Sequence, residues 1–200
     1  MIIGVLAVQG GVAEHQRTLD ALGIEHRAVR RIEHLEGIDG IILPGGESTT
    51  MSKLLTIGGL YEPLRAALAD GLPAYGTCAG MILLSSKVLD TRPDAVSFGA
   101  LDATVRRNAF GRQVDSFEAD LAFEGIEESV HAVFIRAPWI EEVGPGVKVL
   151  ARVPDGPNAN AIVAVTQGNI LATSFHPEVT GDTRVHEYFL QMVRDAKKAK

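Results

Sequence analysis

The sequence has a single cysteine, Cys78, among its 200 residues. One cysteine cannot close a disulfide within the chain, and it cannot supply the several thiolates of a structural zinc site. Both kinds of cross-link are therefore excluded. If Cys78 has a role beyond packing, it acts as a free thiol.

Long apolar runs and basic blocks are also missing. No stretch reaches the roughly 18 apolar residues that mark a candidate membrane-spanning helix. The first apolar run, MIIGVLAV, has neither the basic segment nor the cleavage site of a signal peptide. Lys and Arg number 19 against 25 Asp and Glu, and no cluster of them is long enough to follow a nucleic-acid backbone. We expect a cytoplasmic protein that has neither a membrane nor a nucleic acid as its partner.

The first half of the sequence alternates short apolar runs with segments of helical periodicity. IIGVLAV, IEHRAV and GIDGIILPGG predict strands, and VAEHQRTLDALG predicts a helix that ends at Gly23. Another helix starts near Ser48 or Thr49, either of which suits an N-cap. The stretch AGMILLSSKVL after Cys78 has the apolar content of a further helix. Strands that alternate with helices are typical of a parallel sheet covered by helices.

The second half consists of shorter strand-like runs separated by turn residues. They are FGALDATV, VDSFEADLAF, VHAVFIRAP and VKVLARV, followed by two β-rich runs that predict a hairpin around residues 167–169. The last segment, TRVHEYFLQMVRDAKKAK, predicts an amphipathic helix. We expect residues 1–200 to form a single domain of the α/β class, with a mostly parallel central sheet flanked by helices and an added β-rich second half.

Cys78 lies at the centre of Gly76-Thr77-Cys78-Ala79-Gly80, between a predicted strand and a predicted helix. The pattern Gly-x-nucleophile-x-Gly holds a nucleophile on a sharp turn, because only glycine-sized neighbours let the strand and the helix pass so closely. The N-terminus of the following helix favours a thiolate, and the Ala79 N–H is a candidate oxyanion donor. For these five residues alone, a small buried cysteine in a turn is an equally good interpretation.

The stretch SFHPEV contains a candidate base and a candidate carboxylate. His176 follows a β-rich run, and Glu178 lies two residues later. In an extended segment residues i and i+2 point the same way, so the Glu178 carboxylate would orient the imidazole. With Cys78 these residues would form a triad of thiol, imidazole and carboxylate. Taken alone, a histidine before proline in a polar loop is the simpler interpretation.

The stretch LPGGEST, at residues 43–49, ends a predicted strand. It lacks the lysine of a phosphate-binding loop. The Gly46 N–H would complete an oxyanion hole opposite Ala79, and Glu47 would attract an ammonium group of a substrate. An ordinary turn from strand to helix explains the same residues.

The remaining histidines predict no metal site. They lack the spacing and the shared acidic neighbours of one, and we expect neither a metal nor a cofactor. These residues are His15, His26, His34, His131 and His186.

In this order, the three stretches resemble the class I glutamine amidotransferase family, whose Cys-His-Glu triad falls on Cys78, His176 and Glu178. The resemblance extends to the glutaminase subunits of pyridoxal 5'-phosphate synthase. It is carried by GVLAVQG, LPGGESTTM, GTCAG, RNAFGRQVDSFEADL, VFIRAP and SFHPE, which cover nearly the whole chain. The stretch RNAFGRQVDSFE separates these subunits from other stand-alone glutaminases.

The resemblance implies an activity, a partner and further site residues. The chain would hydrolyse L-glutamine to glutamate and ammonia, and the ammonia would pass to a separate synthase subunit that builds pyridoxal 5'-phosphate from sugar phosphates. Gly46 and Ala79 would form the oxyanion hole, and Gln9 would respond to the synthase partner. The residues implied in binding L-glutamine are Gly46, Glu47, Ser48, Arg107, Ile135 and Arg136.

Two alternatives stay open at this point. The chain could be a glutaminase for a different synthase, or a cysteine hydrolase of the same fold that acts on another amide. It could also be a non-catalytic binding subunit that keeps the fold, although the presence of Cys78, His176 and Glu178 together argues against this. Glutamine turnover that responds to one synthase partner discriminates among these interpretations.

Overall fold

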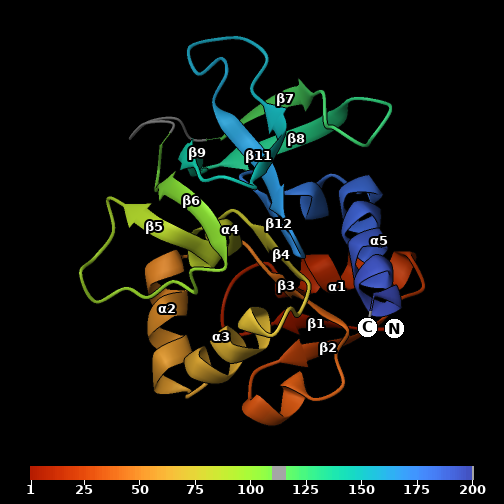
Figure 1. Ribbon diagram of the computed structural model, residues 1–200. Helices are drawn as coiled ribbons and strands as arrows, with labels where there is room; N and C mark the ends of the chain where they lie inside the picture. The colour runs from red at the N-terminus through yellow and green to blue at the C-terminus, as the bar shows by residue number, and fades with distance from the viewer. Residues whose placement is uncertain (110–115, 200) are drawn as a thin grey trace.

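The computed structural model, which describes residues 1–109 and 116–199, contains one large twisted sheet with helices on both faces (Figure 1). The strands are β1 (Ile2–Leu6), β2 (Glu25–Val29), β3 (Gly40–Leu43), β4 (Ala74–Thr77), β5 (Ser85–Leu89), β6 (Leu101–Arg106), β7 (Ser116–Leu121), β8 (Val130–Ile135), β9 (Trp139–Val143), β10 (Lys148–Arg152), β11 (Ile162–Gln167) and β12 (Ile170–Thr173). The order in the large sheet is β2-β1-β3-β4-β12-β11-β9-β6-β5, and β10 pairs with β11. β7 and β8 form a separate antiparallel pair.

Five neighbouring strands at one end of the large sheet, from β2 to β12, are parallel. Four of them come from the first half of the chain, where strands and helices were predicted to alternate, and that prediction is confirmed. The fifth, β12, comes from near the C-terminus and lies beside β4, with Thr173 opposite Thr77. This pairing brings two distant parts of the sequence to the same edge of the sheet.

The other end of the sheet is largely antiparallel, as expected for the β-rich second half. β11 pairs antiparallel with β12, β10 and β9, and β9 pairs antiparallel with β6. The hairpin between β11 and β12 turns at Gly168, whose φ of 54° is in the range that favours glycine, so the predicted turn is confirmed. β9 was not predicted, because Ile140 is its one fully buried residue and the strand carries no alternating pattern.

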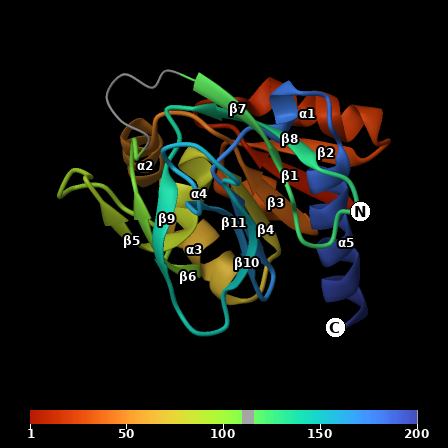
Figure 2. The same cartoon turned by 90° about the horizontal axis from the view of Figure 1, so that it is seen from above.

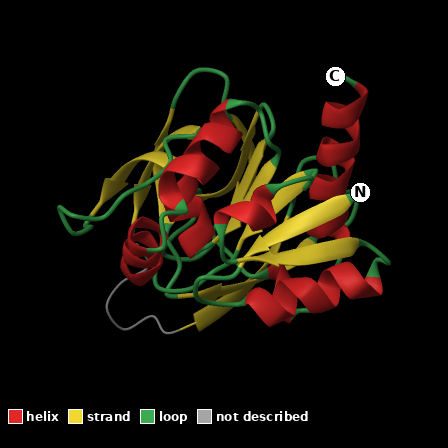
Figure 3. Ribbon diagram, turned by 90° about the horizontal axis from the view of Figure 1, so that it is seen from below, coloured by secondary structure: helices red, strands yellow, loops and turns green. Residues whose placement is uncertain are grey.

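Two layers of helices cover the parallel strands. The helices are α1 (Val12–Ala21), α2 (Ser48–Ile57), α3 (Tyr61–Ala69), α4 (Ala79–Leu84) and α5 (Arg184–Lys198), with short 3-10 helices η1 (Ile32–Leu35) and η2 (Pro177–Val179). Alternate residues of β3 show the layering: Ile42 packs with α1 and α5, whereas Ile41 and Leu43 pack with α2, α3 and α4. Figure 2 shows the strands between α1 and α3, and Figure 3 shows the same layers from the opposite side.

The ends of three helices test the local predictions. Gly23, with φ 67°, closes α1: its N–H donates to Asp20 O, as expected for a left-handed cap. The N-cap of α2 is Glu47, not Ser48 or Thr49, because its carboxylate accepts from the first-turn N–H groups. The predicted helix after Cys78 is also too long. α4 ends at Leu84, where the Ser85 hydroxyl donates to Ile82 O and the chain continues as β5.

None of the helices in the described part of the chain has the length and apolar character that crossing a membrane requires. The stretch RNAFGRQVDSFE, which carries much of the family resemblance, lies partly outside the described residues, since 110–115 are not among them. Arg107, at its start, is described.

Candidate active site

The candidate residues gather where the parallel strands end. β1, β3, β4 and β12 are neighbours, so their carboxyl ends share one edge, and open α/β sheets bind ligands outside that edge. A pocket of about 630 Å³ lies there. It is lined by Gly10, Gly11, Glu14, Gly45, Gly46, Glu47, Ser48, Cys78, Ile82, Arg107, Asn108, Ile135, Arg136, His176, Glu178 and Val179.

Cys78 occupies a sharp turn between β4 and α4. Its φ of 48° and ψ of −103° lie in a region that residues with a Cβ rarely adopt. The two flanking glycines explain how the turn fits: a Cβ on Gly76 would lie 2.5 Å from the Gly80 carbonyl carbon, and a Cβ on Gly80 would collide with Leu43 O. The cysteine therefore stands at the end of a strand with its backbone fixed by close packing.

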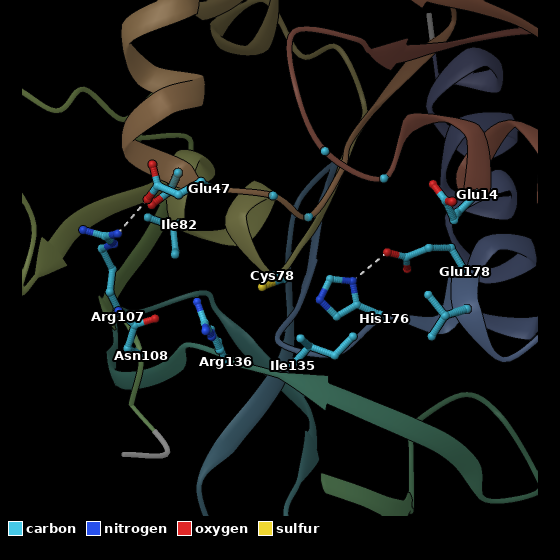
Figure 4. A pocket seen from close by; sticks show the side chains of 16 residues that line it. Glu14, Glu47, Cys78, Ile82, Arg107, Asn108, Ile135, Arg136, His176 and Glu178 are labelled. Atoms are coloured by element: carbon cyan, nitrogen blue, oxygen red, sulfur yellow. Dashed lines mark hydrogen bonds and ion pairs between the residues drawn. The ribbon is translucent and has the colours of Figure 1, made fainter. Parts of the chain in front are cut away.

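Strand pairing places the second half of the site beside Cys78. The Cys78 N–H donates to Thr173 O at 2.8 Å, at the end of β12. Three residues later the His176 N–H donates to Val133 O of β8 at 3.0 Å. The chain that follows β12 is therefore held between the large sheet and the two-stranded sheet, and the His176 ring lies between Cys78 and Glu178 (Figure 4).

His176 and Glu178 are in direct contact. His176 Nδ1 is 2.7 Å from Glu178 Oε1, and the Glu178 side chain is 2% exposed. The predicted backbone conformation between the two residues was wrong. The segment is not extended, since residues Pro177–Val179 form the 3-10 helix η2, and its turn brings the carboxylate back to the ring. Nδ1 faces Glu178, which leaves Nε2 as the nitrogen that is free to act at the Cys78 side.

The surroundings of His176 favour its charged form. Burial alone would lower its pKa, but hydrogen bonds and charges from Cys78 and Glu178 raise the pKa to about 10. At neutral pH the ring is therefore protonated. An imidazolium beside a cysteine favours the thiolate, which is the nucleophilic form.

The glycine-rich end of β3 lies next to Cys78, since a Cβ on Gly45 would be 3.4 Å from the Cys78 Cβ. A Cβ on Gly45 would collide with the His176 ring, so the imidazole needs a glycine at this place. A Cβ on Gly46 would collide with Gln9 Oε1. That same oxygen accepts the Glu47 N–H at 2.9 Å, so Gln9 holds the peptide between Gly46 and Glu47.

Glu47 and Arg107 form an ion pair at the far side of the pocket. Arg107 Nη2 is 2.9 Å from Glu47 Oε1. Burial would raise the pKa of Glu47, but hydrogen bonds from Thr49 and Thr50 lower it to about 2. Ser48 follows as the first residue of α2 and is buried at the pocket wall. The wall therefore carries a permanent negative charge beside a guanidinium.

Ile135 and Arg136 reach the pocket from the end of β8. Arg136 has a positive φ of 45°, and Ile135 is 44% exposed at the mouth of the pocket. Figure 4 shows Arg107 and Arg136 on the side of Cys78 away from Glu178. The predicted site residues line this pocket with two exceptions, Gln9 and Ala79. Gln9 Oε1 accepts the Glu47 N–H, and Ala79 is buried as the first residue of α4, directly after Cys78.

Several residues near the site were not predicted. His15 and His186 were assigned no role, yet both are fully buried, His15 next to Glu178 and His186 next to His15. His131, which was predicted to belong to no metal site, contacts Asp120 and Glu118 across the β7–β8 pair. Neighbouring strands and packed helices create these contacts, and no local pattern marks them. The other pocket residues that sequence reasoning missed are Gly10, Gly11, Glu14, Gly45, Ile82, Asn108 and Val179.

Comparisons with known proteins agree with this geometry. The chain matches the SNO glutamine amidotransferase family over residues 5–195. It is 65% identical to the pyridoxal 5'-phosphate synthase subunit PdxT of Corynebacterium jeikeium over 194 residues, which cover 97% of each chain. It is also 65% identical to the subunit of the same name from Nocardia farcinica over 195 residues, with 97% of this chain and 86% of that one covered.

Solved structures give the same result for the fold. A crystal structure of a glutamine amidotransferase superposes with a TM-score of 0.89 at 48% identity and covers 96% of this chain and 99% of its own. The PurLQS structure from Thermotoga maritima superposes with a TM-score of 0.68, at 18% identity, over 95% of this chain and 97% of its own. At that identity the second likeness concerns the fold alone.

Proposed function

The chain belongs to the SNO glutamine amidotransferase family, and from this premise we propose that it hydrolyses L-glutamine to glutamate and ammonia for a pyridoxal 5'-phosphate synthase. Its relatives are named pyridoxal 5'-phosphate synthase subunit PdxT, which supports the assignment to pyridoxal 5'-phosphate synthesis. One observation carries the chemistry: the sole cysteine stands on a sharp turn at the end of a strand, with His176 between it and a buried carboxylate. The chain acts as the glutaminase subunit of the complex.

In the first half of the reaction the Cys78 thiolate attacks the side-chain carbonyl carbon of glutamine. The carbonyl electrons move onto oxygen and form a tetrahedral oxyanion. As the oxyanion collapses, the C–N bond breaks and His176 Nε2–H protonates the departing ammonia. The product is a glutamyl thioester on Cys78, with a neutral imidazole beside it.

In the second half a water molecule attacks the thioester. Neutral His176 accepts a proton from this water, and the proton goes to the sulfur or remains on the ring as glutamate leaves. Glu178 stays ionised throughout and fixes the ring through Nδ1, as the 2.7 Å contact supports. No step requires a metal or an organic cofactor.

The oxyanion would rest on the backbone N–H groups of Ala79 and Gly46. The Ala79 N–H belongs to the first turn of α4, where N–H groups have no acceptor within the helix. Gly46 lines the same pocket, in a peptide segment held by Gln9. Gln9 contacts this segment. We therefore infer that binding of the synthase subunit acts through Gln9 to orient the Gly46 N–H toward the oxyanion.

The α-amino and α-carboxylate groups of glutamine need opposite charges in the pocket. Glu47 would bind the ammonium group, because its carboxylate stays ionised, and Arg107 or Arg136 would bind the carboxylate. Ser48 and Ile135 would line the part of the pocket that holds the side chain of the glutamine substrate. This arrangement suits a free amino acid and orients its amide toward Cys78.

The proposal includes two further points. Residues 1–200 work as one domain, because the pocket draws residues from both halves of the chain, from Gly10 to Val179. The protein works in the cytoplasm, since the proposed chemistry uses Cys78 as a free thiol and such thiols persist in reducing compartments.

The direct test is ammonia release from glutamine, measured with and without the synthase subunit of a pyridoxal 5'-phosphate synthase. We expect turnover that rises when this subunit is added, together with pyridoxal 5'-phosphate formation from glutamine. Asparagine and a subunit from an unrelated amidotransferase serve as controls. Stimulation by the unrelated subunit alone would assign the chain to a different synthase.

Glu178→Gln is expected to lower kcat by at least about 100-fold. It removes the negative charge that orients the His176 ring and stabilises its protonated form. The Glu178 carboxylate raises the pKa of His176, so the neutral amide lowers it. The fall of kcat/KM on the alkaline side should therefore move to lower pH. A pH profile of glutamine hydrolysis with the synthase subunit present measures both effects, and an unmoved alkaline limb would contradict the assigned role.

Arg107→Ala and Arg136→Ala are expected to raise the KM for glutamine. A hydrogen bond to a charged group contributes about 1.5–3 kcal/mol, so the variant that loses the carboxylate contact should show roughly a 10- to 150-fold increase. Arg65→Ala is the matched control, since Arg65 pairs with Glu62 on the surface of α3. Unchanged KM values in both pocket variants would remove the arginines from glutamine binding.

A further inference from the structure

A buried polar cluster lies behind the proposed triad and has no part in the chemistry described above. It consists of His15 on α1, His186 on α5 and Thr77 at the end of β4, all fully buried. His15 Nδ1 is 2.9 Å from His186 Nε2, and His15 Nε2 is 3.2 Å from Thr77 Oγ1. His15 Nε2 is also 3.5 Å from Glu178 Oε1. One imidazole therefore contacts both the triad carboxylate and the residue directly before Cys78.

The contacts assign the protons of the two rings. His186 Nδ1 is buried and has no hydrogen-bond partner among the described residues. An orphaned buried N–H is rarer than an orphaned acceptor, so Nδ1 is the unprotonated nitrogen. His186 Nε2–H then donates to His15 Nδ1, which leaves the His15 proton on Nε2. That N–H faces Glu178 and Thr77.

Both rings are held neutral. Burial lowers the pKa of His15, although the Glu178 charge acts in the opposite direction. Burial lowers the pKa of His186 to about 3, and a proton on His15 would lower it in the same direction. The charged side chains that influence this pair from the surrounding elements are Glu14 on α1, His176 and Glu178 around η2, and Asp182 before α5. Tyr75 on β4 packs edge-on against both rings.

We propose that His15 is a positioning residue for Glu178, with His186 fixing its tautomer. The inference deepens the proposed function and rests on it. Glu178 Oε2 has no hydrogen-bond partner among the described residues, so Oε1 makes the contacts to both His176 and His15. The His15 N–H keeps this oxygen turned toward His176 Nδ1, and its contact with Thr77 holds the strand end that carries Cys78. Without it the carboxylate can rotate away, and the imidazolium loses its partner.

Cys78 can report on its own environment, because it is the only cysteine in the chain. The rate of its alkylation by iodoacetamide, measured against pH in the full-length protein without glutamine or synthase, follows the thiolate fraction. His15→Asn and His15→Gln form a matched pair. The longer glutamine places an N–H near the position of Nε2, whereas asparagine reaches only the position of Nδ1 and the His186 contact.

His15→Asn is expected to raise the pH of half-maximal alkylation by about one unit, since a less firmly paired His176 favours the thiolate less. His15→Gln should recover most of the wild-type value. Val185→Ala is the control for stability, because Val185 is buried on α5 beside His186 and its apolar side chain cannot donate a hydrogen bond to Glu178. A midpoint that is unchanged or lower in His15→Asn, or that rises equally in Val185→Ala, would overturn the inference.

A kinetic readout separates the inference from the proposed function. With the synthase subunit present, His15→Asn should lower kcat about 10- to 100-fold, the usual range for residues that orient a catalytic group, and leave the KM for glutamine within about twofold. Wild-type protein that releases no ammonia would contradict the proposed function, and the alkylation midpoints would still decide the role of His15.

Discussion

Replacing Cys78 with alanine is expected to reduce ammonia release from glutamine by at least about 1,000-fold in the presence of the synthase subunit. In the proposed mechanism the thiolate forms the bond to the substrate carbonyl, and within the described residues no other side chain at the pocket supplies a comparable nucleophile. Alanine keeps a Cβ, so the unusual backbone angles at residue 78 are equally unfavourable in both proteins. The comparison therefore isolates the chemistry from the fold.

Two controls accompany this variant. Its melting temperature and its binding to the synthase subunit should match those of wild type, since only one atom is removed from the turn. In wild type, a diazo-ketone analogue of glutamine should label Cys78 alone. Alanine protein that released as much ammonia as wild type would identify the chain as a non-catalytic subunit, and labelling at another residue would move the nucleophile elsewhere.

His176→Asn is expected to lower ammonia release by a similar factor, about 1,000-fold or more, because both proton transfers pass through the imidazole. Asparagine retains a polar group toward Glu178, so the buried carboxylate keeps a hydrogen-bond partner. The variant should also react more slowly with iodoacetamide at neutral pH, since the charge that favours the thiolate is gone. Kinetic assays and alkylation rates measure the two effects separately.

His131→Asn is the matched control for this change, because His131 is an exposed histidine on β8 that pairs with Asp120 and Glu118. It should retain wild-type turnover. Binding of His176→Asn to the synthase subunit should be nearly intact. If turnover and synthase binding were lost together, His176 would have a structural role and the proposed mechanism would be wrong.

Much of the site could be predicted from sequence because its elements are local. A cysteine between two glycines, a histidine two residues before a glutamate, and a glycine pair after an apolar strand are each readable in a few residues. The alternation of strands and helices then implies that the strand ends share one edge. The fold and the approach of these three stretches were accessible by this route.

What could not be predicted depends on contacts between distant elements. His15 and His186 meet only because α1 and α5 pack on the same face of the sheet, and neither lies in a motif. The turn of η2 that brings Glu178 to His176 was missed because a residue before proline favours extended backbone, whereas the helical turn begins only at Pro177 itself. Glu47 as the N-cap of α2 was missed for a different reason, since serine and threonine have the stronger general preference.

The pairing of β4 with β12 also governs when the protein becomes able to react during its synthesis. Tyr75 and Thr173, which join the two strands through their side chains, are 98 residues apart. A nascent chain that ends before β12 carries Cys78 but not His176, its proposed base, and it leaves unpaired the edge of β4 that β12 covers in the folded protein. The pairing of β12 with β4 and the placement of His176 beside Cys78 occur together, late in synthesis. An unfinished chain therefore has an unpaired strand but no glutaminase activity.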